Sequence, residues 1–302
     1  MSGEPIHAEL IAVPVAVTAA RPRVLTLFDG SALPAGPLES GHRSLQAGLR
    51  NWVERLTGHP LGHVEQLYTF ADPARSRAGR SISISYLALT GETRTPLGGR
   101  VSWQDWYRYF PWEDRREKDW CEPAALIETT IKPGLDRWSA GSDERRSRAS
   151  SCFGLDGALW NEDLVLARYE LLYEAGLVRE AARDGRPSHG EFASGAIMAA
   201  DHRRILATAI TRLRARIGYR PIVFELMQDH FTLLDLQCCI EAIAGHSLHK
   251  QNFRRLIESQ NLLEATGDLA PGSGRPAKLF RFRPEILAER AHAGTRLTLA
   301  RS

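Results

Sequence analysis

Residues 233–259 read LLDLQCCIEAIAGHSLHKQNFRRLIES, and this stretch decides the fold of the C-terminal third of the chain. Apolar side chains recur every three or four residues on both sides of Gly245, so the pattern predicts two helices joined by a short turn. Thr232 is suited to cap the first helix, and Ser247 is expected to cap the second, which we place at residues 248–259. Two helices joined by a glycine-containing turn of this length are typical of a helix-turn-helix.

The second of these helices has an apolar face and a polar face. We expect its core-facing side chains to be Leu248, Phe253, Leu256 and Ile257, which leaves a row of hydrogen-bond donors outside. Lys, Arg and Asn side chains can donate to phosphates and to base edges in the major groove of DNA. The helix therefore has the composition of a recognition helix.

The residues after this helix predict a wing. A stretch rich in Gly, Ser and Pro at residues 267–274 separates two segments with basic flanks, as in a β-hairpin with an irregular tip. Arg275, at the edge of that tip, is suited to a minor-groove or backbone contact. The residues expected to contact double-stranded DNA are Ser247, His249, Lys250, Asn252, Arg254, Arg255, Arg275 and Lys278.

The distribution of charge favours a polyanionic partner for this part of the chain. Residues 1–200 contain 23 basic and 26 acidic residues, a net charge of −3, and residues 201–302 contain 16 basic and 10 acidic residues, a net charge of +6. A basic C-terminal third is typical of nucleic-acid binding. The alternative is a winged helix that binds protein through a merely solvated basic face. RNA is less favoured, because no platform of stacking aromatic side chains is evident.

The first 200 residues predict strands around one helix, followed by a mainly helical region. Runs of β type occur at residues 8–17, 23–28, 63–70 and 80–90, and an amphipathic helical pattern at residues 42–57 ends at Gly58. The mixture places the chain in the α+β class. We expect loops at residues 31–40, 139–150 and 183–190, a helix at 161–175 and a basic helix at 200–217, with the domain boundary between residues 200 and 201.

Composition excludes several classes of protein. With 302 residues, 43% of them hydrophobic, the chain is long enough for two domains and is not disordered. The apolar stretch at residues 10–17 is far shorter than the roughly 20 residues that span a bilayer, so we expect a cytoplasmic protein with no membrane segment. The four cysteines and ten histidines lack ligand spacing, so we expect neither a metal site nor a disulfide framework. Aromatic side chains are dense at residues 103–120, where a core or a dimer seam is favoured over a ligand cage.

Three segments together resemble a known family. They are FRR at residues 253–255, GRPA at 274–277 and HVEQLYTFADP at 63–73. These segments resemble bacterial regulators of NAD metabolism that join a Nudix-like domain to a winged helix, as in the NrtR type. The insert at residues 103–138 and YELLYEAGL at 169–177 look more like the NadQ type. The resemblance implies a Nudix-like α/β/α sandwich at residues 1–200, followed by a winged helix-turn-helix at 201–302.

The resemblance does not extend to catalysis. A Nudix hydrolase carries the box G-x5-E-x7-R-E-U-x-E-E-x-G-U, in which U is aliphatic and clustered glutamates hold Mg²⁺. With Gly58 as the closing glycine, the remaining key positions hold no carboxylate. A shift by one residue recovers only Glu54 and loses the closing glycine. Glu170 and Glu174 imitate the end of the box, but they follow the strands and are expected to be ordinary surface charges. We therefore expect a protein that is not an enzyme.

A domain of this shape without a metal site can still bind a nucleotide. The NadQ type implies ATP as the effector, and the NrtR type implies ADP-ribose or NAD; no other cofactor is expected. Arg43, Arg50 and Arg80 are candidates to meet its phosphates, whereas Trp52 is favoured as a core residue.

The expected function is a homodimeric repressor of NAD biosynthesis or salvage genes that binds a palindromic operator and is released or modulated by an adenine nucleotide. The helix at 200–217 is a candidate connecting lever. The alternatives are a divergent Nudix-type pyrophosphatase with a regulatory tail and a ligand-responsive scaffold that binds protein.

Overall fold

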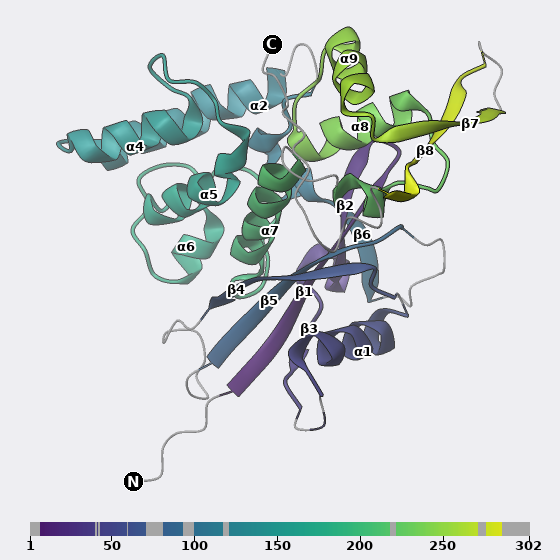
Figure 1. Cartoon of the computed structure of the whole chain (residues 1–302). Coiled ribbons are helices and arrows are strands. Elements are labelled where there is room, and N and C mark those ends of the chain that lie inside the picture. Colours follow the sequence, from purple (N-terminus) through teal and green to yellow (C-terminus); the bar gives the residue numbers. More distant parts are fainter. Residues whose placement is uncertain are drawn as a thin grey trace.

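The computed structural model describes residues 7–39, 41, 43–58, 60–70, 81–92, 100–116, 121–217, 222–270 and 276–285 (Figure 1). A mixed sheet of six strands forms the first part, in the order β4-β5-β1-β2-β6, with β3 paired to β1. Its strands are β1 (His7–Thr18), β2 (Arg21–Leu27), β3 (Ala35–Pro37), β4 (His63–Phe70), β5 (Ser81–Leu89) and β6 (Val101–Asp105). β1 and β5 run parallel, and the other pairs are antiparallel. The expected β runs are all strands of this sheet.

Helices cover both faces of the sheet. Alternate residues of β1 point to opposite faces. Leu10 and Ala12 pack against α1 (Leu45–Thr57), whereas Ile11 and Val13 belong to the main core that they share with α7 (His202–Ile217). Ser44 caps α1 by accepting from the amide of Ala47, and Gly58 ends the helix in the left-handed conformation. The arrangement confirms the expected α/β/α sandwich (Figure 1).

A helical insert follows β6. Its elements are η2 (Trp106–Arg108), η3 (Pro111–Glu113), α2 (Cys121–Leu126), the π-helical turn η4 (Ile127–Ile131), α3 (Lys132–Ser139), α4 (Asp143–Phe153), η5 (Glu162–Leu164), α5 (Val165–Glu174) and α6 (Arg179–Arg183). Trp106, Tyr109, Phe110 and Trp112 are fully buried in the main core. Core packing is therefore the role of these four aromatic side chains.

The loop expected at residues 139–150 is wrong, because α4 occupies most of it. Ser142 caps α4 by accepting from the amide of Arg145, and two apolar side chains, Ala149 and Phe153, bury its inner face. A helix with so few buried side chains shows almost no periodic pattern of apolar residues, so its polar sequence is typical of a loop.

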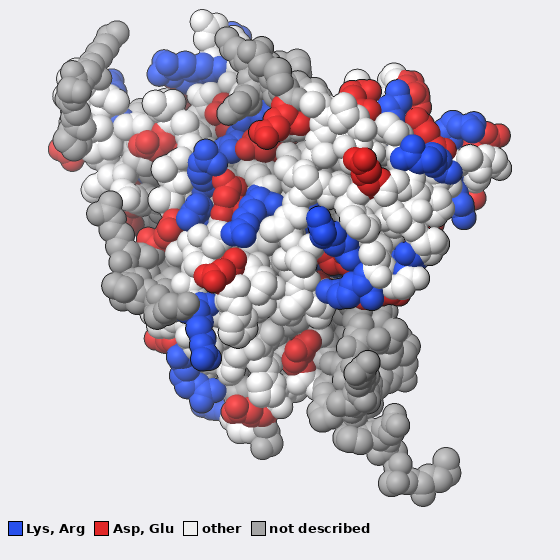
Figure 2. Space-filling view, turned by 180° about the vertical axis from the view of Figure 1, so that it is seen from behind, with Lys and Arg blue, Asp and Glu red and all other residues white. Residues whose placement is uncertain are grey.

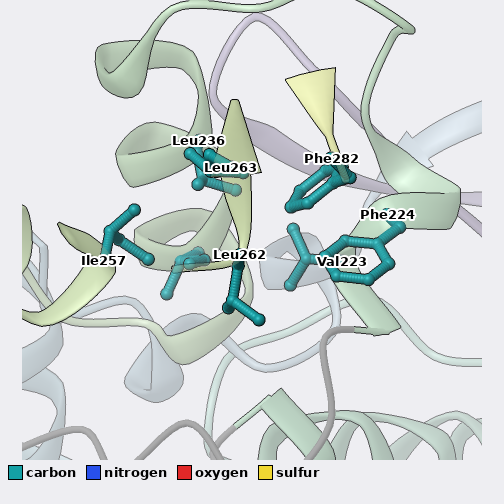
Figure 3. A pocket seen from close by; sticks show the side chains of 8 residues that line it. Val223, Phe224, Leu236, Ile257, Leu262, Leu263 and Phe282 are labelled. Atoms are coloured by element: carbon teal, nitrogen blue, oxygen red, sulfur yellow. The ribbon is translucent and has the colours of Figure 1, made fainter. Parts of the chain in front are cut away.

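The C-terminal part is a winged helix-turn-helix, as expected. Its elements are η6 (Ile222–Leu226), α8 (Leu233–Ala244), α9 (Lys250–Gln260), β7 (Leu263–Leu269) and β8 (Lys278–Phe282). β7 and β8 pair antiparallel, and Phe231 bridges to Phe280 of β8 through two backbone hydrogen bonds of 2.8 and 3.0 Å. Figure 3 shows how Val223, Phe224, Leu236, Ile257, Leu262, Leu263 and Phe282 converge on a small apolar space. No polar group lines this space, so its lining residues form the hydrophobic core of the winged helix.

α7 lies between the two parts of the molecule. It packs on α5 and on strands β1, β4 and β5, and its other neighbours include α8 and η6 of the winged helix. Only Arg212 is exposed along its length, so α7 is a core element for both parts. The boundary between residues 200 and 201 remains a prediction. No helix within the described ranges is long and apolar enough to cross a membrane.

Candidate nucleic-acid interface and sensor face

α9 presents an exposed polar face. Phe253 and Ile257 are buried, whereas Lys250, Arg254 and Arg255 are exposed, in the division that the sequence predicts. Within the described ranges these three cations, together with His249 and Asn252, have no side-chain hydrogen bond or ion pair. Figure 2 shows Lys and Arg side chains at the end of the molecule where α9 lies in Figure 1, whereas basic and acidic side chains are interspersed over the rest of that face.

Two polar side chains of α8 fix the start of the recognition helix. Gln237 Nε2 donates to the carbonyl of Leu248 at 3.0 Å, and Glu241 Oε1 accepts from the amide of Leu248 at 2.8 Å. Gln237 also donates to Glu241 at 2.9 Å. The sequence analysis did not single out this pair, although its signal is visible: two polar residues lie four apart among the apolar residues that follow the first turn of α8. Because both the amide and the carbonyl of Leu248 are hydrogen-bonded, the turn before α9 has a defined geometry.

The N-cap expected at Ser247 is wrong. α9 begins at Lys250, its N-cap residue is His249, and no side chain caps it. The Ser247 hydroxyl instead donates to the backbone carbonyl of Arg116 at 2.5 Å. This partner lies 131 positions away in the sequence, so local pattern could not predict it. Ser247 remains exposed, and its predicted contact with DNA stays a prediction.

The wing places one of the two predicted cations. Lys278 is the first residue of β8, is exposed, and pairs in register with Leu269. Arg275 lies outside the described residues. A register shift between Ala265 and Leu269 interrupts the ladder toward the tip of the hairpin.

Two of the three arginines predicted to meet an effector lie in α1 or just before it. Arg43 is exposed just before the helix cap. Arg50 donates to the carbonyls of Leu61 and Gly62, the latter at 2.7 Å, so its guanidinium holds the loop that leads into β4. Arg80 lies outside the described residues. Trp52 packs directly over Gly36, since a Cβ there would lie 2.0 Å from the indole, and it belongs to the cluster under α1.

The residues of α1 do not fit a Nudix metal site. Glu54 is the single carboxylate of this helix, and it is exposed. Within the described ranges no three His, Cys, Asp or Glu side chains gather closely enough to hold an ion. Glu170 and Glu174 form ion pairs with Arg204 at 2.6 Å and with Arg148 at 2.8 Å. No step through a metal ion is therefore derived for this chain.

A buried ionic cluster joins the insert to the winged helix. Glu113 accepts from Arg168 at 2.5 and 2.8 Å and from Arg214 at 2.7 Å, and all three side chains are about 1% exposed or less. Burial alone would raise the pKa of Glu113, but Arg168 and Arg214 hold it below its usual value. Arg214 also donates to the carbonyl of Ile243 in α8 at 2.9 Å.

Comparison with known proteins gives the winged helix a family. Residues 223–282 match the model of the NrtR DNA-binding winged helix domain. A stretch of 85 residues is 38% identical to the ADPR responsive transcriptional repressor NtrR of Acinetobacter baylyi. That stretch covers 28% of this chain and 34% of the relative, so the similarity spans about a third of the relative's length.

Solved structures share the architecture of nearly the whole chain. The NrtR of Shewanella oneidensis in complex with a 27mer DNA matches with a TM-score of 0.56 at 18% identity, over 93% of this chain and 95% of that one. A MutT/nudix family protein from Enterococcus faecalis matches with a TM-score of 0.52 at 15% identity, over 94% and 88% of the two chains. The fold is therefore a Nudix-like sandwich joined to a C-terminal winged helix, as the sequence predicts.

Proposed function

We infer that this chain, which carries an NrtR-type winged helix at residues 223–282 on a Nudix-like sandwich, is a DNA-binding transcriptional repressor of NAD biosynthesis or salvage genes. The observation that carries the inference is the exposed face of α9. Its cations lack side-chain partners among the described residues, and they lie on a helix whose start is fixed by two hydrogen bonds to Leu248. A rigid helix with free donors is suited to a major groove.

The residues proposed to contact DNA divide into two groups. Lys250 and Asn252, near the start of α9, are placed to reach base edges, because the N-terminal residues of a recognition helix enter the groove. Arg254 and Arg255 follow one turn later, and Lys278 lies on the wing, where contact with phosphates is the expected role. Ser247, His249 and Arg275 complete the proposed set.

The proposed effector is an adenine nucleotide bound by the sandwich. The relative from Acinetobacter baylyi is named as ADPR responsive, which favours ADP-ribose. ATP and NAD are the alternatives that the family resemblance leaves open. Arg43, Arg50 and Arg80 are proposed contacts for its phosphates. Since Arg50 holds the carbonyls of Leu61 and Gly62, an anion that attracts this guanidinium would also release that loop.

We further propose that the protein is not an enzyme and acts in the cytoplasm as a homodimer on a palindromic operator. The single carboxylate of α1 supports the absence of hydrolysis. The second candidate, a divergent pyrophosphatase with a regulatory tail, predicts that water cleaves the diphosphate bond of ADP-ribose to AMP and ribose 5-phosphate in the presence of Mg²⁺. The proposed repressor forms neither product.

The experiment that tests the function is DNA binding by the Arg254→Ala/Arg255→Ala variant. Loss of two cations from α9 is expected to weaken binding to promoter DNA of NAD biosynthesis genes about tenfold or more and to lower the salt slope by about 2. The matched control is Arg145→Ala/Arg146→Ala, which removes two adjacent exposed arginines from α4. Equal effects of the two double variants, or unselective binding to random duplex, would refute the proposed function.

A further inference from the structure

We propose that Tyr107 is a positioning residue for the recognition helix, and that the segment at residues 107–116 carries the effector's signal to the helix-turn-helix. The proposal rests on the proposed function and deepens it, because it assigns the route by which the sandwich controls α9. This route differs from the one expected from the sequence, in which the helix α7 alone acts as the connecting lever.

The end of α8 is held by groups that lie outside the winged helix. The last carbonyl groups of a helix have no partner within the helix and need one elsewhere. Here the Tyr107 hydroxyl donates to the carbonyl of Ala242 at 2.8 Å, and Arg214 Nε donates to that of Ile243 at 2.9 Å. The amide of Arg115 donates to the carbonyl of Gly245 at 2.7 Å.

The contact between the turn and this segment is as close as backbones allow. Gly245 has a φ of 79°, and a Cβ built on it would lie 2.5 Å from the carbonyl oxygen of Glu113 and 2.6 Å from Arg214 Nη2. Only glycine fits such an approach in this conformation. Two residues later, Ser247 donates to the carbonyl of Arg116, so the turn before α9 is attached on both sides.

The other end of the segment is attached to the sheet. Tyr107 lies in η2, which directly follows β6, and its amide donates to Asp105 at 2.9 Å. Arg116 Nη1 donates to the carbonyl of Ala20, in the turn between β1 and β2, at 2.5 Å. The segment thus connects the edge of the sensor sheet to the helix-turn-helix within ten residues, while the buried Glu113 fixes its middle.

A displacement of β6 or of the β1–β2 turn therefore has a direct mechanical consequence. α9 cannot turn against the sandwich unless the hydrogen bonds from the segment to Ala242 and Gly245 break or the segment moves with it. Packed and hydrogen-bonded contacts of this kind carry coupling between sites when they have two arrangements. α7 contributes to the same contact through Arg214.

The first test measures hydrogen exchange in the full-length protein without DNA. Tyr107→Phe removes a hydroxyl that donates to the carbonyl of Ala242 and accepts from Arg214 Nη2 at 3.4 Å. It is expected to speed exchange of the peptide spanning residues 243–253 about fivefold. The matched control is Tyr109→Phe, because Tyr109 is also buried in the same segment but donates to the carbonyl of Gly30 at 2.7 Å. In Tyr109→Phe, the peptide at residues 243–253 should exchange at the same rate as in the parent protein.

The second test measures coupling. The ratio of the DNA Kd with ADP-ribose to the Kd without it is expected to fall severalfold in Tyr107→Phe and in Tyr107→Phe/Ser247→Ala, and to stay unchanged in Tyr109→Phe. A purely structural role would lower stability in both tyrosine variants and leave this ratio alone.

The two proposals fail separately. A parent protein that does not bind DNA refutes the proposed function, while the exchange measurement still decides whether Tyr107 holds the turn. If Tyr107→Phe and Tyr109→Phe give the same exchange at residues 243–253, or the same coupling ratio in a protein that binds DNA, the assignment of Tyr107 is overturned.

Discussion

At the scale of single residues, His202 is a buried base that must stay neutral. Its Nδ1 accepts the backbone amide of Leu33 at 2.9 Å, so this nitrogen carries no proton in the folded chain. Burial, with Arg183 nearby, lowers the pKa of His202 to about 4. The side chain joins the N-terminus of α7 to the segment before β3.

His202 is expected to make stability fall with acidity. The unfolded chain binds the proton from about pH 6.5 downward, and the folded chain only near pH 4, so the free energy of unfolding decreases between these values by up to about 3 kcal/mol. His202→Asn keeps an acceptor without a titrating group, and denaturant unfolding at pH 7 and pH 4.5 should show a smaller difference than in the parent. An unchanged difference would contradict the assignment.

Glu113 illustrates the cost of an unpaired buried charge. Glu113→Gln leaves Arg168 and Arg214 buried without their carboxylate and is expected to destabilise the protein by about 3–5 kcal/mol at pH 7. Because the folded pKa lies below its ordinary value of 4.5, the carboxylate's contribution is complete above that pH and is lost as pH falls through the folded pKa. The control is Glu144→Gln, at an exposed position of α4. Equal unfolding free energies for the two variants would contradict the cluster's role.

At the scale of elements, α8 depends on its first turn. Thr232 Oγ1 accepts from the amide of Asp235 at 3.1 Å, while Asp235 Oδ2 accepts from the amide of Thr232 at 2.8 Å, a reciprocal capping box. Thr232→Ala is expected to cost about 1 kcal/mol and to speed exchange within α8. Ser142→Ala removes the cap of α4 and should speed exchange in α4 but not in α8. Faster exchange in α8 with both variants, or with neither, would contradict a local role.

Periodicity predicted the elements that bury a continuous face. α1, α7, α8, α9 and strands β1, β2, β4 and β5 place apolar side chains against the core, so a single sequence suffices to find them. β3, which buries only Gly36, lies within residues 31–40, and the loop expected there is wrong in this part. Periodicity did not predict α4, because this helix buries only Ala149 and Phe153 and depends on the cap at Ser142. Its helical state is fixed by packing against its neighbours rather than by its own pattern.

The candidate DNA-binding site was also predictable from the sequence only in part. The outward side chains of α9 follow from the positions of Phe253 and Ile257, and the structure places them as predicted. The support of that helix does not follow from sequence, since Tyr107 and Arg115 meet the end of α8 across more than 120 positions. Contacts between segments so far apart leave no local signal, which is why the sequence predicts Ser247 as the cap of α9 although its hydroxyl donates to the carbonyl of Arg116.

At the scale of the whole molecule, the sandwich and the winged helix form a continuous structure. The main core includes side chains from the sheet, the insert, α7 and the winged helix, and the buried Glu113 cluster lies where these parts meet. Two parts joined by a shared core can transmit a small displacement, because packed interiors deform little. We therefore expect nucleotide binding and DNA binding to be coupled in this chain.

The measurement that tests this claim most directly is fluorescence anisotropy of the full-length protein on labelled promoter DNA of NAD biosynthesis genes, at two salt concentrations, with ADP-ribose, ATP or NAD added separately. We expect tight, salt-sensitive binding that one of the nucleotides weakens and that random duplex does not reproduce. Binding no tighter than to random duplex, or binding that none of the three nucleotides changes, would contradict it.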